Sequence, residues 1–219
     1  MIARFFSFLF PLTRKIDSRY SGKLELTMIN GKKVLDTKNT NYSYGSLQRV
    51  MRYSLNQIDF QHVQSILLLG LGGGSVVKTL REEKEFKGKI TGVEIDPVII
   101  QIAEDEFGIL SDTVTEIIQA NAWDFVMGCK EKYDLIIVDL FIDNIVPSKF
   151  LSNDFWKLLL ELLHSEGDIV FNTLCEPASD LTEIENKFQR RGIEYMVHRH
   201  VEKTNKVLIA HYHVPRQAC

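Results

Sequence analysis

Apolar segments of strand length alternate with amphipathic segments from Ser65 onward, and this alternation predicts the main architecture. The apolar runs are typical of strands buried on both faces of a sheet, and the stretches between them have the periodicity of helices. The predicted strands are Ser65 to Leu69, Lys89 to Glu94, Glu116 to Gln119, Tyr133 to Asp139 and Asp168 to Thr173. Helices are expected to begin near Gly74, Pro97, Asn121 and Asn153, with one more after Asp180. Such alternation indicates an α/β protein with a parallel sheet.

The end of the chain has a different pattern. Glu194 to Val201 and Lys206 to Val214 are two strand-like segments joined by a few polar residues. So short a link allows only antiparallel pairing. Five parallel strands followed by an antiparallel hairpin resemble the seven-stranded, Rossmann-like sheet of class I S-adenosylmethionine-dependent methyltransferases, and differ from a nicotinamide-binding Rossmann domain.

The N-terminal quarter predicts a smaller β element. Lys23 to Thr37 alternates around Asn30-Gly31, a pair suited to a tight hairpin turn because both residues tolerate positive φ. A helix is expected from Gly45 to Leu55. We therefore divide the chain into an N-terminal arm, hairpin and helix (1–56) and a Rossmann-like domain (57–219).

Ile2 to Leu12 is strongly apolar but shorter than the roughly 20 residues that a membrane-spanning helix needs. We expect no membrane span. One interpretation is a secretory signal peptide, although Pro11 interrupts the segment and no small-residue cleavage pattern follows. The interpretation we favour is an arm that docks its phenylalanines on the body of the protein or on a second subunit. In the second case the chain would form a homodimer through this region.

Composition narrows the class of protein. The chain has 219 residues, of which 45% are hydrophobic and 25% charged, so it can build a substantial core. Its 26 Lys and Arg against 29 Asp and Glu give a net charge of -3 without a basic stripe, so we do not expect nucleic acid as a partner. The three cysteines are far apart and match no zinc spacing. Reduced thiols and a cytoplasmic location are expected.

Leu67 to Leu80 carries the strongest local signal, because an apolar strand runs into glycines and then directly into a helix. Gly70, Gly72 and Gly74 let the backbone turn sharply and let a ligand approach the main chain. The spacing does not fit a dinucleotide fingerprint, since Ser75 stands where that fingerprint needs glycine. It does not fit a Walker loop either, because no Gly-Lys-Ser/Thr follows. We therefore predict that this turn, from Gly70 to Ser75, binds a cofactor, and the alternative is a tight turn that binds no ligand.

Polar residues follow the next two strands. Glu94 ends its strand twenty residues after Gly74, and a carboxylate there can accept hydrogen bonds from both ribose hydroxyls of a nucleoside. Asp96 is better explained as the cap of the helix at Pro97. Asn121, followed by Ala122, can read an adenine edge, cap a helix, or do both.

Asp139 ends the fourth strand, next to the topological switch point where open α/β sheets bind ligands. It is the main catalytic candidate, because a carboxylate can orient an attacking amine or accept its proton. Asp143, in the following loop, is a second candidate, although a loop carboxylate is usually only solvated. The histidines at 198, 200, 211 and 213 would form a metal site only if their strands paired in one register, so we predict no metal.

At these residues the sequence resembles the spermidine synthase family and its related methyltransferases. The resemblance covers the hairpin, NYSYGSL around Tyr44, GLGGGS, VEIDP, NAWDF, YDLIIVDLF and the closing hairpin. It implies a transferase that binds S-adenosylmethionine or its decarboxylated form, often as a dimer. Carried over by position, it implies that Gly70, Gly72 and Gly74 line the cofactor, Glu94 holds the ribose, Asn121 faces adenine and Asp139 is the catalytic carboxylate.

The departures from the family pattern bear on the reaction. Ser75 replaces the acid of GGGDG, and Asp139-Leu140-Phe141-Ile142-Asp143 replaces DSSDP. A polyamine needs several carboxylates, because burying unpaired ammonium groups costs several kcal/mol each. We therefore favour a methyltransferase that acts on an unidentified small molecule. Aminopropyl transfer, or a non-catalytic relative that only binds the nucleoside, are the alternatives.

Overall fold

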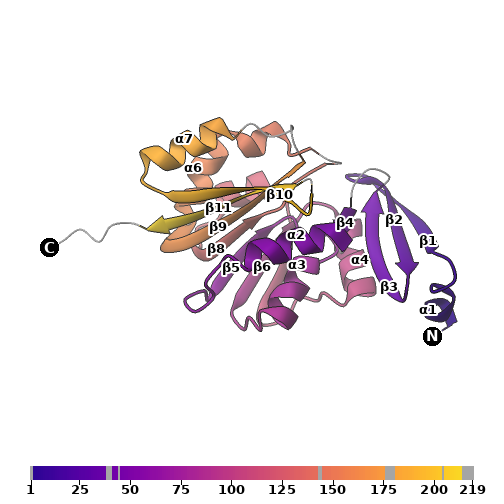
Figure 1. Cartoon of the computed structure of the whole chain (residues 1–219). Helices are drawn as coiled ribbons and strands as arrows, with labels where there is room; N and C mark the ends of the chain where they lie inside the picture. Colours follow the sequence, from indigo (N-terminus) through magenta and orange to yellow (C-terminus); the bar gives the residue numbers. More distant parts are fainter. Residues whose placement is uncertain are drawn as a thin grey trace.

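The structure is a computed structural model, and it describes residues 2–37, 41–43, 45–142, 145–175, 181–203 and 205–213. A seven-stranded sheet forms its centre, in the order β10-β11-β9-β8-β5-β6-β7 (Figure 1). Its strands are β5 (Ser65–Leu69), β6 (Lys89–Glu94), β7 (Thr115–Gln119), β8 (Tyr133–Val138), β9 (Leu163–Cys175), β10 (Glu194–Val201) and β11 (Asn205–His213). Strands β9, β8, β5, β6 and β7 run parallel, and β11 pairs antiparallel with both β9 and β10. The predicted fold class is confirmed.

Alternation along β5 explains why helices cover both faces of this sheet. Leu67 and Leu69 contribute to one core and Ile66 and Leu68 to another, and all four are fully buried. The first core also contains buried residues of α5 (Ala122–Gly128), α6 (Asn153–Glu161) and α7 (Thr182–Arg190). The second contains residues of α2 (Gly45–Leu55), α3 (Ser75–Lys78) and the π-helical turn η1 (Thr79–Glu83). Helix α2 thus packs against the central sheet.

A second, four-stranded antiparallel sheet lies beside the first, in the order β1-β2-β3-β4. It consists of β1 (Leu12–Ser18), β2 (Gly22–Ile29), β3 (Lys32–Thr37) and β4 (Asn41–Ser43). The predicted turn joins β2 to β3, with φ of 50° at Asn30 and 72° at Gly31. Our sequence analysis missed β1, because only Leu12 and Ile16 mark an apolar face in that segment.

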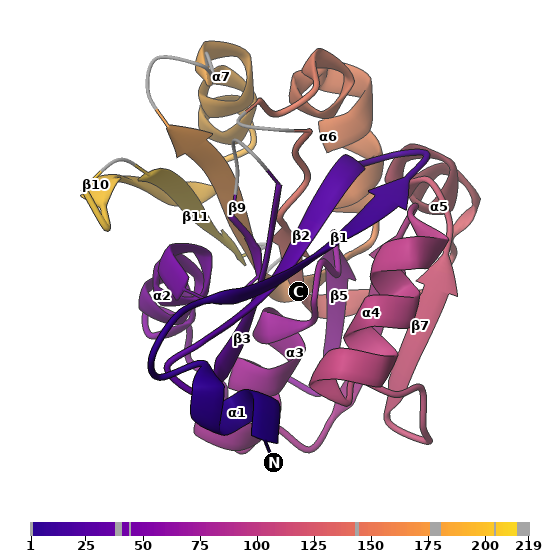
Figure 2. The same cartoon turned by 90° about the vertical axis from the view of Figure 1, so that its right-hand side faces the viewer.

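Helix α4 (Pro97–Phe107) joins the two sheets (Figure 2). Its Ile99 and Ile102 pack with Leu24 and Leu35 of the small sheet in a third core, and all four side chains are buried. The small sheet is therefore fixed next to the end of β6, from which α4 begins.

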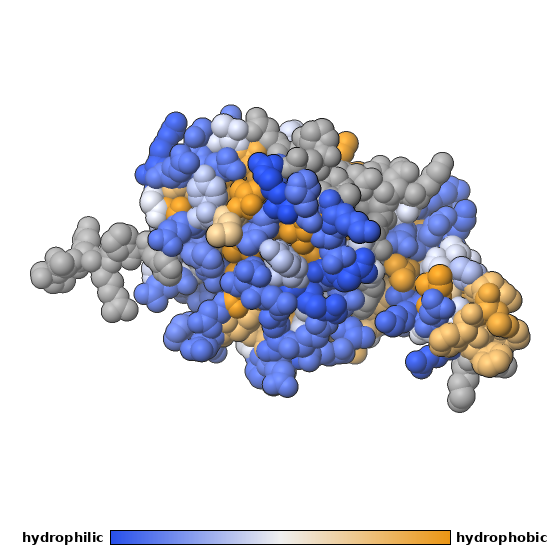
Figure 3. Space-filling model, viewed as in Figure 1, coloured by the Kyte–Doolittle hydropathy of each residue, from blue (hydrophilic) through white to orange (hydrophobic). Residues whose placement is uncertain are grey.

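The apolar N-terminal segment is attached to the small sheet through Ser7, but its phenylalanines are not buried on the body of the protein as expected. Docking on a second subunit stays a prediction. The segment forms α1 (Ile2–Phe6) and a turn, and Phe5 is 69% and Phe8 62% exposed. The apolar surface they contribute to lies at one end of the molecule (Figure 3). In the part of the chain that the structure describes, every helix is too short or too polar to cross a membrane.

Several boundaries differ from the sequence prediction, most of them by one or two residues. Strand β9 begins at Leu163, five residues earlier than expected, where Leu163 pairs with Tyr133 of β8. Helix α7, which was expected after Asp180, has Leu181 at its N-cap position, and Asp180 itself lies outside the described residues.

Candidate functional site

The carboxyl ends of four parallel strands meet at one edge of the central sheet. Gly70 N donates to Val93 O at 2.9 Å, Ala120 N to Glu94 O at 3.0 Å and Asp139 N to Leu69 O at 2.9 Å. A cleft of about 910 Å³, part of it open to solvent, lies at this edge. Six of its lining residues were predicted from the sequence: Gly70, Gly72, Glu94, Asn121, Ala122 and Asp139. The cleft therefore occupies the ligand site expected for an open α/β sheet.

The glycine turn is shaped by close contacts. Gly70 has φ +92°, and a Cβ built there would lie 2.1 Å from the Asp139 carbonyl oxygen. Gly74 has φ +79°, and its Cβ would lie 2.4 Å from Ile109 Cγ1. Gly74 and Ser75 belong to the turn but are not among the residues that line the cleft. Gly70 thus brings β5 against β8 under the cleft, while Gly74 packs the turn against the protein.

Glu94 is held by backbone amides. Its Oε2 accepts from Gly72 N at 3.1 Å, and its Oε1 accepts from Ile95 N at 3.0 Å and Asp96 N at 3.1 Å. Burial raises the pKa of Glu94, the amides oppose that shift, and the nearby charge of Asp96 adds to it. The side chain is 9% exposed and lines the cleft, so it presents a fixed acceptor to a ligand.

Asp96 has the capping role expected from the sequence and a further one. Its Oδ1 accepts from Val98 N at 3.0 Å, which caps α4. Its Oδ2 accepts from the hydroxyls of Ser18 and Ser21, the latter at 2.7 Å. These serines flank the β1–β2 turn, which places Tyr20 and Ser21 in the lining of the cleft. The sequence did not predict that Tyr20 and Ser21 line the cleft, because Ser21 lies 75 residues from Asp96 in the chain.

Asn121 caps α5, which is one of the two roles expected from the sequence. Its Oδ1 accepts from Trp123 N at 2.9 Å, and its side chain also lines the cleft beside buried Ala122. Trp123 stacks on Phe155 with ring centroids 5.8 Å apart, so its indole packs against the core.

Asp139 is buried beside an amide. It is 8% exposed, and its Oδ1 accepts from Asn172 Nδ2 at 2.9 Å. Burial raises the pKa of Asp139 to about 7, against the lowering effect of Asn172, and the charge of Glu94 adds to the rise. Sequence reasoning missed Asn172, although a polar residue in the apolar run of β9 was a usable signal. Asp143, the second catalytic candidate, lies outside the described residues.

The side of the cleft next to Asp139 is largely apolar. It is built from Leu140, Phe141, Ile142, Pro147 and Phe150. Lys149, from the 3-10 turn η2 (Ser148–Leu151), also lines the cleft, with Nζ 4.8 Å from the centroid of the Phe150 ring. Among the described lining residues, Glu94 and Asp139 are the carboxylates.

His198 and His211 are not cross-strand neighbours. His198 pairs with Val207 across β10 and β11, whereas His211 pairs with Glu194. Tyr53 Oη lies 2.9 Å from His198 Nδ1, and His211 Nδ1 lies 2.7 Å from Asp168 Oδ1. Over the described ranges, three or more His, Cys, Asp or Glu residues do not gather into a metal-binding group.

Sequence relatives are transferases of two kinds. A polyamine aminopropyltransferase of Vibrio vulnificus is 36% identical over 113 residues, which cover 50% of this chain and 38% of that protein. An eEF1A lysine and N-terminal methyltransferase homolog of Drosophila melanogaster is 26% identical over 179 residues, which cover 74% of this chain and 26% of that protein. The chain thus spans well under half of these relatives.

Solved structures share the fold at low identity. Human methyltransferase-like protein 13, in complex with SAH, has a TM-score of 0.63 and 21% identity, covering 80% of this chain and 86% of that one. Spermidine synthase from Thermotoga maritima has a TM-score of 0.57 and 15% identity, covering 93% and 70%. The spermine/spermidine synthase domain model matches residues 50–200, more than half of the sequence, and the chain therefore belongs to that family.

Proposed function

We propose that the protein is an S-adenosylmethionine-dependent methyltransferase that acts on a small-molecule acceptor. The observation that carries this proposal is the apolar acceptor side of the cleft, where Asp139 stands among Leu140, Phe141 and Ile142. Among the described lining residues, Glu94 and Asp139 supply the carboxylates, and these are too few to pair a buried polyamine dication as well as a ribose. Each unpaired buried charge costs several kcal/mol.

The residues present fit a sulfonium nucleoside. Gly70 and Gly72 leave the floor of the cleft free of side chains, and the fixed Glu94 carboxylate suits two ribose hydroxyls. Asn121 uses Oδ1 as a helix cap, so Nδ2 is the group we expect to donate to an adenine ring nitrogen. When bound, the sulfonium supplies an electrophilic methyl group. This assignment is in line with the SAH complex of the human methyltransferase-like neighbour.

Asp139 is the residue we expect to handle the acceptor. A carboxyl group with a pKa of about 7 is partly ionised near neutral pH, so it can accept the proton that a nucleophile loses. Asn172 fixes one of its oxygens and leaves the other to orient the acceptor. With the cofactor bound, the role of these residues would be to align the acceptor lone pair with the sulfonium methyl group, and alignment of this kind would supply most of the catalysis. Asp143 is retained as a second candidate.

Aminopropyl transfer is the alternative function, because several relatives are named polyamine aminopropyltransferases. It requires that additional carboxylates complete the acceptor site. A protein that binds the nucleoside without turnover is a third hypothesis. The net charge of -3 argues against a nucleic-acid acceptor in each case.

Calorimetry with two ligands tests the proposal. We expect the protein to bind S-adenosylmethionine more tightly than decarboxylated S-adenosylmethionine. A clear preference for the decarboxylated compound would overturn methyl transfer in favour of aminopropyl transfer. If neither compound binds or raises the melting temperature, the assignment of the cleft as a nucleoside-binding site is wrong.

A further inference from the structure

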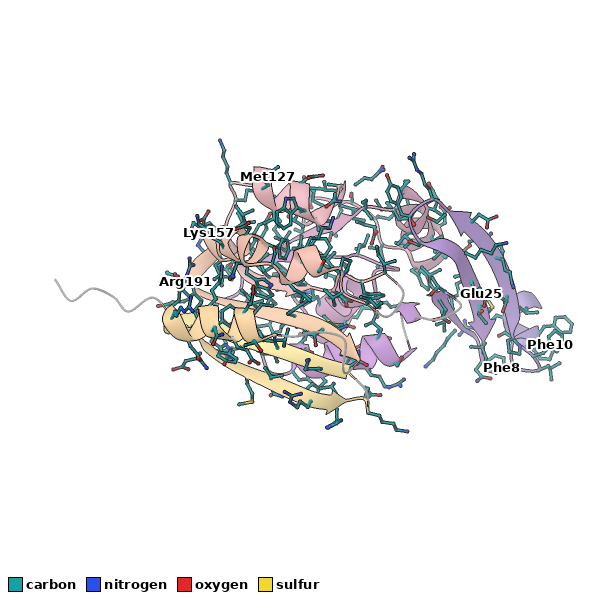
Figure 4. The ribbon with its side chains drawn as sticks, turned by 90° about the horizontal axis from the view of Figure 1, so that it is seen from above. Phe8, Phe10, Glu25, Met127, Lys157 and Arg191 are labelled. Carbon is teal, nitrogen blue, oxygen red and sulfur yellow. The ribbon has the colours of Figure 1, made fainter. Side chains whose placement is uncertain are left out.

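Five large apolar side chains near the N-terminus face solvent. This phenylalanine arm consists of Phe5, Phe6, Phe8, Leu9 and Phe10, which are 42–69% exposed. Figure 3 shows the apolar surface at one end of the molecule, and Figure 4 shows Phe8 and Phe10 at the outer end of the small sheet. A contiguous apolar surface of this kind marks an interaction site, because water disfavours it.

The arm is fixed to the small sheet at the β2–β3 turn. Ser7 lies between the exposed phenylalanines but is only 1% exposed. Its carbonyl accepts from Asn30 N at 2.9 Å, and its hydroxyl accepts from Gly31 N at 2.9 Å and donates to Arg4 O at 2.7 Å. The sheet therefore presents the arm in a defined position.

Positively charged residues lie near the arm in the sequence and in the small sheet. Arg4 belongs to α1, Lys32 and Lys33 follow the turn that holds Ser7, and Arg14 lies in β1 two residues after its start. Glu106 pairs with Arg14 at 2.6 Å and with Lys33 at 2.8 Å, which leaves an excess of cations. Near the arm, four cations (Arg4, Arg14, Lys32 and Lys33) thus stand against Glu106, in a chain whose total charge is -3.

We propose that the phenylalanine arm anchors the protein to a membrane surface that contains anionic lipid. Aromatic and leucine side chains next to Lys and Arg are the combination that inserts at the headgroup boundary of such a bilayer. A second copy of the chain fits less well, because pairing these faces would bring two positively charged surfaces together. The charge therefore selects the lipid surface as the occupant.

The position of the arm leaves the cleft accessible. The arm contacts the β2–β3 turn, whereas the β1–β2 turn at the opposite end of the small sheet lines the cleft through Tyr20 and Ser21. The seven residues of β1 separate the two ends by roughly 23 Å. An anchored protein could thus still bind its ligands, and membrane binding does not depend on the proposed methyl transfer.

Vesicle flotation tests the anchor with the purified full chain. The vesicles contain phosphatidylcholine alone or with about one third phosphatidylserine. We expect the wild type to float with the phosphatidylserine vesicles, with at least roughly tenfold weaker partitioning onto neutral vesicles or at high salt. The triple variant Phe5→Ser, Phe8→Ser, Leu9→Ser should lose binding, and Arg4→Glu with Lys32→Glu should weaken it about tenfold or more.

A matched control replaces exposed apolar residues elsewhere. Met127 and Met196 are each 62% exposed, so the double variant Met127→Ser, Met196→Ser should float like the wild type. Circular dichroism and the melting temperature verify that each variant is folded. The proposal is overturned if the wild type stays in solution with both kinds of vesicle, or if the triple variant still floats. A dimer that the triple variant dissociates, without vesicle binding, would instead assign the arm to a second copy of the chain.

Discussion

Asn172 Nδ2 donates to Asp139 Oδ1 across 2.9 Å, from the strand next to the one that Asp139 follows. Both side chains are buried, and the amide directs one carboxyl oxygen while the other remains for a ligand. The bond opposes the rise in the pKa of Asp139 that burial causes, and that pKa still reaches about 7. Asn172 therefore fixes the direction of the carboxyl group in the cleft, whereas burial is the main cause of its raised pKa.

Asp139→Asn should change the pH dependence of stability. The pKa of Asp139 rises from 3.8 in the unfolded chain to about 7 in the folded protein, so only the folded protein keeps this proton between those pH values. The free energy of unfolding of the wild type should fall across that window as pH rises, and stay level above it. The variant should lack this contribution and be more stable above the window by up to about 4 kcal/mol.

Urea denaturation at about pH 5 and pH 8 measures this difference, because the two conditions bracket most of the titration. Asp124→Asn is the control, since Asp124 is exposed at the start of α5. Equal slopes for the wild type and Asp139→Asn would show that Asp139 does not titrate in this window.

Glu94→Gln should weaken nucleoside binding. The substituted amide loses the charge that we expect the ribose hydroxyls to contact, which corresponds to roughly 1.5–3 kcal/mol, or about tenfold to a hundredfold in Kd. Calorimetry with S-adenosylhomocysteine measures the change. Glu104→Gln, on the exposed side of α4, should leave Kd unaltered. An unaltered affinity for Glu94→Gln would refute the ribose assignment.

Gly70→Ala should destabilise the protein far more than Gly108→Ala. Both glycines have positive φ, but a Cβ at Gly70 meets the Asp139 carbonyl oxygen at 2.1 Å, whereas one at Gly108 meets open space. The backbone conformation alone costs about 1 kcal/mol, and we expect at least about 3 kcal/mol at Gly70 because β5 and β8 must separate. The urea midpoints of the two variants check the prediction, which fails if they coincide.

Ser21→Ala should make the β1–β2 turn, which lines the cleft, less stable. The variant loses the 2.7 Å hydrogen bond to the buried Asp96, at a cost of about 1.5–3 kcal/mol. Amide hydrogen exchange in the β1–β2 turn should increase, and S-adenosylhomocysteine should bind several-fold more weakly. Thr13→Ala, which removes an exposed hydroxyl pair with Thr27 in the same sheet, should do neither.

Local pattern was sufficient for much of the site. Strands β5, β6 and β10 have the predicted bounds, and Glu94 and Asp139 lie at the strand ends where the sequence placed them. The strand bounds could be predicted because burial on both faces of the sheet produces continuous apolar runs in the sequence. The site residues could be predicted because parallel strands bring their carboxyl ends to one edge of the sheet. The helix caps at Asp96 and Asn121 were equally readable, because a cap acts within two residues of its own position.

The sequence by itself thus determined the α/β architecture, the glycine turn and the row of polar residues along the sheet edge. Only the tertiary structure decided that Ser18 and Ser21 hold Asp96, that Asn172 directs Asp139, and that the phenylalanine arm faces solvent. The physical reason is the distance along the sequence over which each kind of interaction acts. Periodicity and capping act over a few residues, whereas these contacts join segments 33 to 78 residues apart and depend on how whole sheets pack.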